Sequence, residues 1–400
     1  MDLFSLLKGL RHHLHAYPEL GFQEVQTQAA LRSALEQHAH IPPANFRSCA
    51  STGLVVDIDG PGCPTRCIAF RSDMDALPMT ECNAKLTYKS TEAAVAHMCG
   101  HDGHMTTLVG FAIVLMQKRE LLPKNTRIRL LFQPSEEENP GGAIAMIKDG
   151  CLEGVDEVYG YHNYGFPLGQ VHVLPGAVMA HEQEFNVVIH GHGGHGSAPQ
   201  NCKDPIVIAA QIVNAVQTII SRSLSPYDTA VVSITQIHAG QVNNVIPSTA
   251  TLGGTMRDYD PKAALTIRKQ FEAIVNGVCT MNGATCTISF TEGYPAVVNS
   301  VKETEIVQEI AKSCCTLSTD GLPLMASEDM SYYLQERPGC FYFLGTKEPN
   351  DPQVRDLHSD QYDFNDKALP LGVKMFLKIA QHRLGCTLYT DNEFDKMLHA

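Results

Sequence analysis

The chain has 400 residues, of which 44% are hydrophobic and 18% are charged. This is more than one hydrophobic core usually holds, so we expect two domains. The 43 acidic residues outnumber the 30 basic residues and give a net charge of −13, which argues against nucleic acid as a partner and favours small-molecule ligands.

The N-terminal segment is expected to form an amphipathic helix, because Leu3, Phe4, Leu7 and Leu10 recur at helical spacing. Its apolar runs are too short and too interrupted for a signal peptide, and no other stretch approaches a membrane span in length. Thirteen cysteines are scattered along the chain, which is typical of reduced thiols rather than of a disulfide framework. We therefore expect a cytoplasmic protein without a membrane partner.

The first part of the chain predicts an α/β sheet covered on both faces, because short apolar runs alternate with helical patterns. The predicted strands cover 54–58, 67–72, 127–132 and 155–161, and the predicted helices cover about 106–118 and 143–148. Five candidate site residues come just after these strands: Asp73, Asp75, Glu136, Glu137 and His162. Open α/β sheets bind their ligands at this edge.

Residues 181–296 follow a different order, β-α-β-β-α-β, which is the ferredoxin-like split motif. We expect an inserted domain here, so that the first domain comprises 1–180 and 297–400. The inserted strands are predicted at 184–189, 230–237, 249–256 and 285–290, and its helices at 205–222 and 261–279. The first domain resumes with a strand at 341–344 and a closing helix at about 366–383, and we expect no regular structure in the acidic tail after Gly385.

The segment Cys99-Gly100-His101 has the composition of half a metal site. Thiolate and imidazole are ligands that zinc prefers, and Gly100 permits the compact backbone that lets both reach one ion. A second interpretation makes Cys99 a nucleophile paired with His101 or His104, as in thiol hydrolases.

Three adjacent carboxylates, Glu136 to Glu138, repel one another, and a bound cation would relieve that repulsion. A solvated acidic turn explains them equally well on their own. Beside the cysteine and histidine cluster, they favour a site in which one carboxylate binds metal and its neighbour transfers protons. His162 and His358 are two of 18 histidines, so each alone is more often a surface or packed side chain than a ligand.

The glycine-rich segment 191–196 matches G-x-G-x-x-G, but the following strand ends without the acidic residue that a dinucleotide site needs. We interpret it as a loop that directs His195 at a substrate, or as a turn with bystander histidines. Asn244 could donate to a carbonyl and Arg257 could bind a carboxylate. A turn asparagine and a surface arginine are equally consistent interpretations.

Several motifs together resemble the M20 metallopeptidases and amidohydrolases, in particular the aminoacylase-like branch of hippurate hydrolases, N-acyl-amino acid amidohydrolases and indole-3-acetyl-amino-acid hydrolases. They extend from about residue 11 to 384, nearly the whole chain. The matching segments are LHAYPELGFQE, RSDMDALPM, CGHDGHMTTLVG, FQPSEEENPGGA, the histidine of GYHNYG, GHGGHGSAP, NNVIP, GTMRDYD, SEDMSYYL with PGCFYFLG, and LHSDQYDF.

The resemblance implies a metallohydrolase domain with a mixed central sheet and an inserted lid and dimerisation domain. It implies one or two divalent metal ions, zinc or manganese, with cobalt or nickel as further candidates, held by five residues: Cys99, His101, Glu137, His162 and His358. It also implies that Glu136 is the general base, that Asp75 belongs to the catalytic site, and that His195 and Asn244 contact the substrate carbonyl, the histidine serving the neighbouring subunit of a homodimer or higher homo-oligomer.

The implied reaction is hydrolysis of the amide bond of N-acyl amino acids such as hippurate or N-acetyl amino acids, with Arg257 or the lid holding the substrate carboxylate. Alternative substrates are N-acetyl-diaminopimelate and indoleacetyl-amino acid conjugates. A protein that binds without catalysis would be a different class of function. The chain departs from the branch at Lys367, where an acidic residue is usual, and at Gln200, where histidine is frequent; the second departure concerns contacts of the lid loop.

Overall fold

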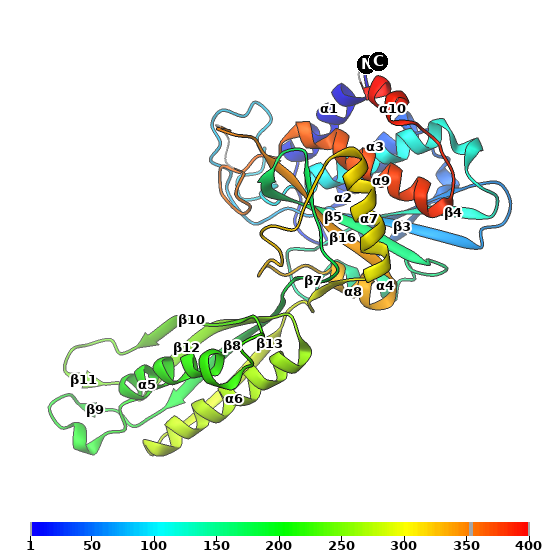
Figure 1. Ribbon diagram of the computed structural model, residues 1–400. Coiled ribbons are helices and arrows are strands. Elements are labelled where there is room, and N and C mark those ends of the chain that lie inside the picture. Colours follow the sequence, from blue (N-terminus) through cyan, green and yellow to red (C-terminus); the bar gives the residue numbers. More distant parts are fainter. Residues whose placement is uncertain (1, 352–354, 399–400) are drawn as a thin grey trace. The chain divides into compact units, whose positions relative to one another are not determined.

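The computed structural model describes residues 2–351 and 355–398. The chain divides into two units, shown in Figure 1. Unit 1 comprises Met1–Val178, Val297–Leu322 and Asp329–Ala400, and unit 2 comprises Met179–Ala296 and Pro323–Glu328. These boundaries differ from the expected ones at residues 179–180 and at Pro323–Glu328, which belong to unit 2.

Unit 1 is built on an eight-stranded mixed sheet, so the predicted α/β class with a mixed central sheet is confirmed. Four central strands, β4, β3, β5 and β16, run parallel to one another, and β2 continues the sheet antiparallel to β4. In spatial order the strands are β1 (Phe46–Cys49), β2 (Gly53–Asp59), β4 (Thr126–Gln133), β3 (Arg66–Asp73), β5 (Glu157–Pro167), β16 (Gly339–Lys347), β6 (Gln170–His172) and β15 (Thr316–Ser318). A separate ribbon of β7 (Gly176–Met179) and β14 (Val297–Asn299) lies where the chain enters and leaves unit 2.

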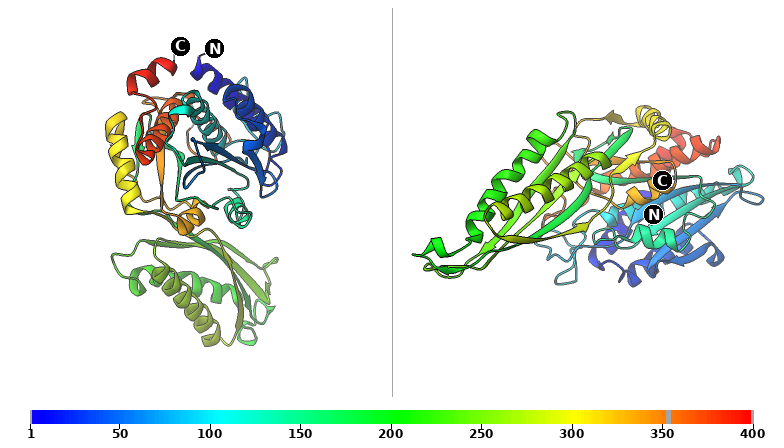
Figure 2. Two further views of the ribbon diagram at one scale, coloured as in Figure 1. Left: turned by 90° about the vertical axis from the view of Figure 1, so that its right-hand side faces the viewer. Right: turned by 90° about the horizontal axis from the view of Figure 1, so that it is seen from below.

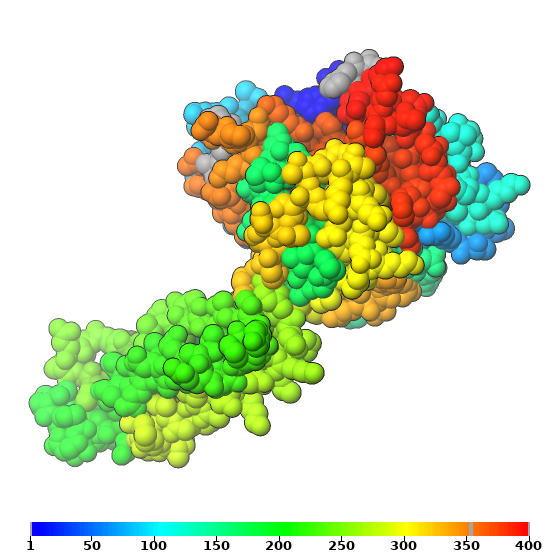
Figure 3. Space-filling view, viewed as in Figure 1, coloured from blue at the N-terminus to red at the C-terminus, as the bar shows by residue number. Residues whose placement is uncertain are grey.

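Helices cover both faces of this sheet (Figure 2). One face carries α1 (Leu3–Ala16), α2 (Val25–His38), α3 (His101–Gln117), α7 (Val301–Cys314), α9 (Leu369–Leu384) and α10 (Asp391–Leu398). The other face carries α4 (Gly142–Lys148) and α8 (Met330–Glu336), which contact each other and the sheet. The side chains of α7, yellow in Figure 3, form part of the unit 1 surface beside the C-terminal segment in red. Short 3-10 helices occupy Pro43–Asn45, Arg119–Leu121, Pro199–Asn201 and Asp366–Ala368.

The core of unit 1 follows from the period-two pattern of its strands. In β3, Ile68 and Phe70 are fully buried and belong to the cluster formed with the helices of the α3 face. Helix α3 is buried along almost its whole length, from His101 to Leu115, and such a helix belongs in the centre of a fold. The first turn of α3 is therefore enclosed by protein on all sides.

Three elements differ from the predicted ones. Helix α3 begins at His101 rather than near Thr106, because its polar first turn hides the helical pattern. Strand β5 continues to Pro167, so His162 lies within the strand and not after it. The tail forms helix α10, and its Phe394 and Leu398 are buried in the unit 1 core, so the expectation of an unstructured tail is wrong.

Unit 2 is the predicted β-α-β-β-α-β motif. Its sheet is antiparallel with the order β10-β12-β8-β13, and two helices pack on one face around a core that includes Phe185, Ile212 and Phe271. The elements are β8 (His181–His190), α5 (Pro205–Thr218), a π-helical turn (Ile219–Ser223), β10 (Ala230–Ala239), β12 (Thr249–Asp258), α6 (Pro261–Met281) and β13 (Thr285–Glu292). A small ribbon pairs β9 (Gly194–His195) with β11 (Val245–Ile246).

The segment Pro205–Ser223 is long and apolar enough by composition to cross a membrane. Its Ile208, Ile212 and Val216 are buried in the unit 2 core, which accounts for much of this apolar character. The packing is that of a core helix lying on a sheet.

Candidate metal centre

The carboxyl ends of the parallel strands bring together most of the predicted site residues of unit 1. The segment after β3 carries Asp75, and the segment after β4 carries Glu136 and Glu137. His162 lies in the neighbouring strand β5, and His101 begins α3. Glu137 is partly exposed and the other four are buried, so their polar groups need partners inside the protein.

Gly100 determines the geometry of the turn between Cys99 and His101. Its φ of 98° lies in the left-handed region, and a Cβ at this position would lie 2.2 Å from the Oδ1 of Asn163. The turn places the Sγ of Cys99 3.4 Å from the Nε2 of His162. Cys99, His101 and His162 form a buried group whose ligand atoms all lie within 4.8 Å of one another, so they could hold one metal ion.

His358 reaches the same cluster from the loop before α9. Its Nε2 lies 3.4 Å from the Oε1 of Glu137, and these two residues form a second group with Cys99. The backbone N–H of His358 donates to the carbonyl oxygen of Met98 at 2.8 Å, which ties the loop to the residue next to Cys99. Because Cys99 belongs to both groups, its thiolate could bridge two ions.

Backbone carbonyls fix the orientation of the two buried imidazoles. The Nδ1 of His101 donates to the carbonyl oxygen of Asp75 at 2.9 Å, and the Nδ1 of His162 donates to that of Asn163 at 2.6 Å. Since a carbonyl oxygen only accepts, each Nδ1 carries a hydrogen and each Nε2 presents a lone pair, as a metal ligand must. The carboxylate of Asp75 also accepts the backbone N–H of Glu137 at 2.9 Å, so Asp75 orients two candidate ligands.

Of the buried atoms of the cluster that lack a hydrogen-bond partner among the described residues, two face each other. They are the Nε2 of His101 and the Oε1 of Glu137, which lie 3.8 Å apart. A lone pair that faces a carboxylate oxygen is unfavourable unless a proton or a cation lies between them. The donor set of thiolate, imidazole and carboxylate fits a divalent metal ion at this position.

The charge of the cluster also favours a bound divalent cation. Burial and the neighbouring Glu137 carboxylate raise the pKa of the Cys99 thiol well above its usual value. Burial alone would lower the pKa of His101, but the carboxylates of Asp73 and Asp75 raise it to about 10. A divalent cation would offset this negative potential, because it favours the thiolate and takes the place of the proton on the imidazole.

His104 lies beside the cluster, but both of its ring nitrogens are already used. Its Nδ1 is 2.7 Å from the Oδ1 of Asp73, and its Nε2 accepts the backbone N–H of Asn163 at 3.0 Å. Asp73 and His104 also lie close to His101. Burial alone would raise the pKa of Asp73, but His101, His104 and Arg71 hold it well below its usual value. Asp73 and His104 therefore contact the cluster without belonging to the two groups that contain Cys99.

The alternative role of Cys99 as a nucleophile is not favoured by this geometry. Its sulfur contacts His162, and burial lowers the pKa of His162 well below its usual value. Of the two partners in the nucleophile interpretation, His101 lies in the same group as Cys99, whereas both ring nitrogens of His104 have other partners. A nucleophilic cysteine needs a lowered thiol pKa, whereas the pKa of Cys99 is raised.

Of the three adjacent carboxylates, two belong to the cluster and Glu138 is exposed. Glu137 takes part in the group that contains Cys99 and His358. Glu136 is 6% exposed, and its Oε2 lies 3.9 Å from the Nε2 of His101. A carboxylate beside a metal position can accept a proton from water held there.

The predicted substrate residues His195 and Asn244 lie together in unit 2. His195 pairs with Val245 across the β9-β11 ribbon, and the backbone N–H of Gly196 donates to the carbonyl oxygen of Asn244 at 2.8 Å. The imidazole of His195 is exposed, and its Nδ1 accepts the backbone N–H of Ser197 at 3.1 Å. This leaves the Nε2–H of His195 as a hydrogen-bond donor.

The glycine-rich segment before this ribbon packs closely on the backbone of its own unit. A Cβ at Gly191 would lie 2.2 Å from the carbonyl oxygen of Lys203, and one at Gly193 would lie 2.5 Å from that of Ile246. These glycines are therefore explained by close backbone packing, which agrees with the rejection of a dinucleotide site.

Arg257, the third predicted substrate residue, is occupied by partners within unit 2. Its Nη2 lies 2.8 Å from the Oε1 of Glu182, and its Nη1 donates to Ser327 at 3.1 Å. The side chain is 21% exposed. A substrate carboxylate would have to compete with this ion pair.

One buried ion cluster next to the site was missing from the sequence-based prediction. Arg11 is fully buried, and its guanidinium contacts Asp102 at 3.2 Å, Asp363 at 3.0 Å and Asp366 at 2.7 Å. Asp102 also contacts the Nδ1 of His15 at 2.9 Å. A signal was present, because Arg11 lies on the same face of α1 as the buried leucines, and a charge on an apolar helix face needs a buried partner.

The sequence is similar to a family of hydrolases over most of its length. The model of peptidase family M20/M25/M40 matches residues 69–382. Amidohydrolase YhaA of Bacillus subtilis is 39% identical over 388 residues, which cover 95% of this chain and 96% of that protein. Hippurate hydrolase of Campylobacter jejuni is 35% identical over 386 residues, which cover 95% of this chain and 97% of that protein.

The fold is also similar to that of a solved structure, the YXEP protein of Bacillus subtilis, described as a dinuclear metal binding peptidase from the M20 family. The TM-score is 0.81 at 29% sequence identity, and the similarity covers 96% of this chain and 99% of that one.

Proposed function

Because the chain belongs to peptidase family M20/M25/M40 and is therefore a hydrolase of amide bonds, we propose that it cleaves N-acyl amino acids with one or two divalent metal ions. The observation that carries this proposal is the cluster in which the buried Nε2 of His101, which has no hydrogen-bond partner among the described residues, lies 3.8 Å from the Oε1 of Glu137. The products are a carboxylate and a free amino acid.

The proposed metal ligands are the side chains that form the two groups around the cysteine: Cys99, His101, Glu137, His162 and His358. Thiolate and imidazole favour zinc, while carboxylate oxygen is also compatible with manganese. Cobalt and nickel are further candidates. When bound, the metal supplies Lewis acidity, which lowers the pKa of water and polarises a carbonyl group.

Glu136 is the proposed general base. In the proposed reaction its carboxylate takes a proton from the attacking water and then returns it to the nitrogen of the leaving amine, so that protons balance over one turnover. Its place beside His101 supports this role. Asp75 is proposed as a positioning residue, because it holds the imidazole of His101 and the backbone N–H of Glu137.

His195 and Asn244 are proposed to stabilise the oxygen that becomes negative when water attacks the amide. Support comes from the Nε2–H of His195, which remains a donor, and from the ribbon that holds both residues together. We propose a homodimer or higher homo-oligomer in which unit 2 serves as lid and dimerisation domain. Arg257 is a weaker candidate for the substrate carboxylate because of its pairing with Glu182.

Hippurate and N-acetyl amino acids are the proposed substrates, and N-acetyl-diaminopimelate and indoleacetyl-amino acid conjugates are the alternatives. The similarity to a hippurate hydrolase supports the first choice. The thirteen cysteines are all free thiols, which supports a reducing compartment, and we propose the cytoplasm.

The experiment is an assay of amine release on these four substrate classes, with protein loaded with zinc, manganese, cobalt or nickel. We expect turnover of at least one N-acyl amino acid, loss of turnover after chelation, and recovery when metal is restored. Turnover that survives complete removal of metal would contradict the metal mechanism. No turnover of any substrate by metal-loaded protein would favour a binding protein without activity.

A further inference from the structure

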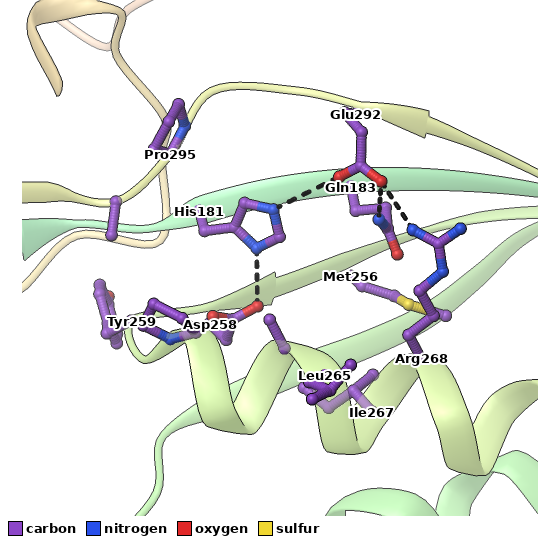
Figure 4. Close-up of a pocket in the computed structure, with 13 residues that line it drawn as sticks. His181, Gln183, Met256, Asp258, Tyr259, Leu265, Ile267, Arg268, Glu292 and Pro295 are labelled. Atoms are coloured by element: carbon purple, nitrogen blue, oxygen red, sulfur yellow. Dashed lines mark hydrogen bonds and ion pairs between the residues drawn. The ribbon is translucent and has the colours of Figure 1, made fainter. Parts of the chain in front are cut away.

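Unit 2 contains a pocket of about 290 Å³ that the proposed reaction does not use. It lies between the start of β8, the ends of β12 and β13 and the first half of α6, and Figure 4 shows the side chains that line it. Its apolar walls include Met256, Pro261, Leu265, Ile267 and Pro295. The volume is close to the lower end of the range of about 300–1,000 Å³ that is typical of small-molecule sites.

One buried carboxylate oxygen in the lining of this pocket lacks a donor. Asp258 is 1% exposed, and its Oδ2 lies 2.8 Å from the Nδ1 of His181. Its Oδ1 is buried and has no hydrogen-bond partner among the described residues. A buried carboxylate oxygen without a partner is unfavourable, and a donor supplied by a ligand would satisfy it.

Three other polar side chains of the pocket, Gln183, Arg268 and His181, are paired with carboxylates of its lining. Glu292 accepts from Arg268 at 2.8 Å and from Gln183 at 2.7 Å, and its second oxygen lies 3.9 Å from the Nε2 of His181. Figure 4 shows the imidazole of His181 between the carboxylates of Asp258 and Glu292. Because the unpaired atom is an acceptor and the donors face carboxylates, the pocket favours a cationic donor over an anion.

We infer that this pocket binds a small molecule with an apolar body and one ammonium group, whose N–H donates to the Oδ1 of Asp258. The inference goes beyond the proposed reaction and does not depend on it. The lining includes residues beside two of the connections between unit 2 and unit 1: His181 lies just after one of them, and Pro295 and Ala296 lie just before another. A bound ligand therefore contacts both of these segments and reduces their local motion.

The test uses the metal-loaded full chain and three probes with one apolar body: 2-phenylethylamine, 2-phenylethanol and 3-phenylpropionate. By calorimetric or NMR titration, we expect the amine to bind about tenfold more tightly than the alcohol, as one charge-assisted hydrogen bond implies. We expect the acid to bind more weakly than either. Absence of amine binding up to millimolar concentration, or tighter binding of the acid, would overturn the inference.

Two variants locate the bound amine. Ala264→Phe fills the pocket from α6 and should weaken amine binding at least about tenfold, whereas Ala273→Phe, at an exposed position of the same helix outside the pocket, should not. Asp258→Asn should remove the preference for the amine over the alcohol. Unchanged amine affinity in folded Ala264→Phe protein would place the amine elsewhere and overturn the assignment.

Hydrogen exchange gives a readout that is independent of activity. The amine should slow exchange of the backbone amides around His181 and Ala296, with no such effect in Ala264→Phe protein. Slower exchange confined to the segments around Cys99 and Glu137 would show binding at the metal centre and would overturn the assignment.

Discussion

The Sγ of Cys99 lies 3.4 Å from the Nε2 of His162, although 63 residues separate them in the chain. The left-handed turn at Gly100 places Cys99 for this contact, and strand β5 places His162. Burial keeps His162 neutral, in the form that binds metal, by lowering its pKa. The thiol of Cys99 and the imidazole of His162 are therefore already held together in the arrangement that the proposed metal site requires.

Replacing Glu136 by Gln should remove catalysis without removing metal. The amide keeps the size of the side chain but cannot accept a proton, so we expect kcat to fall at least about 10²-fold with unchanged metal content. Glu138→Gln is the matched control, because Glu138 is adjacent and exposed, and it should keep normal activity. Full activity of Glu136→Gln at normal metal content would disprove its role as the base.

Replacing Cys99 by Ser should lower the metal content measured by mass spectrometry, because an alcohol is a much weaker ligand than a thiolate. Cys63→Ser changes an exposed thiol and should leave metal content and activity unchanged. If Cys99→Ser bound metal normally but lost all turnover, the nucleophilic role of Cys99 would have to be reconsidered.

Replacing Arg11 by Met should destabilise the fold by up to about 3–5 kcal/mol in chemical denaturation, because it removes the buried cation that contacts Asp102, Asp363 and Asp366 together. Among the described residues, this leaves Asp102 with only His15 and Asp363 with only Arg355 as a cationic partner. Arg32→Met is the control. Arg32 pairs with Glu36 on the surface of α2, where both side chains are more than one third exposed, so the cost should stay below about 1 kcal/mol. Equal costs in the two variants would show that the buried cluster is not a major source of stability.

The stability of the protein should decrease as the pH rises from about 6.5 to 9. Burial alone would lower the pKa of His15, but the hydrogen bond to Asp102 and the Glu81 carboxylate, 3.5 Å from its Nε2, raise it to about 9. Since the folded pKa lies above the unfolded value of about 6.5, the stabilisation is complete below pH 6.5 and is lost as the pH passes 9. This contribution is at most about 3 kcal/mol.

His15→Gln serves as the reference for that measurement. Its free energy of unfolding should depend less steeply on pH over the same range, because the residue no longer titrates. The same slope in both proteins would assign the pH dependence to other groups.

The sequence was sufficient to predict the features that depend on local patterns. Alternating apolar residues predicted the strands and the split motif of unit 2, since burial of one sheet face requires that period. The start of α3 at His101 was missed because its polar first turn is buried by tertiary contacts. Helix α10 was missed because its polar sequence has few apolar residues, of which Phe394 and Leu398 are anchored by the distant core.

The site residues, too, could be predicted only where a local sequence pattern identified them. Cys99 and the carboxylates Glu136 to Glu138 could be selected from their motifs, whereas the choice of Glu137 as a ligand and the individual importance of His162 and His358 depended on the resemblance. The buried partners of Arg11 lie 91 to 355 residues away, and no local pattern specifies such a distance. Pairings of this kind are determined by the packing of α1 against the rest of unit 1.

Unit 1 is interrupted in the sequence by unit 2, so the ribosome makes its C-terminal segment only after the main segment of unit 2. Unit 2 is almost continuous, so its main segment Met179–Ala296 is complete long before His358 and Asp363 are synthesised. Until then, Cys99 and Glu137 lack their third group member, His358, and Arg11 lacks two of its three carboxylates, Asp363 and Asp366. If the proposed ligand set is correct, the second ligand group can bind metal only after His358 has been synthesised, whereas the main segment of unit 2 is complete before that point.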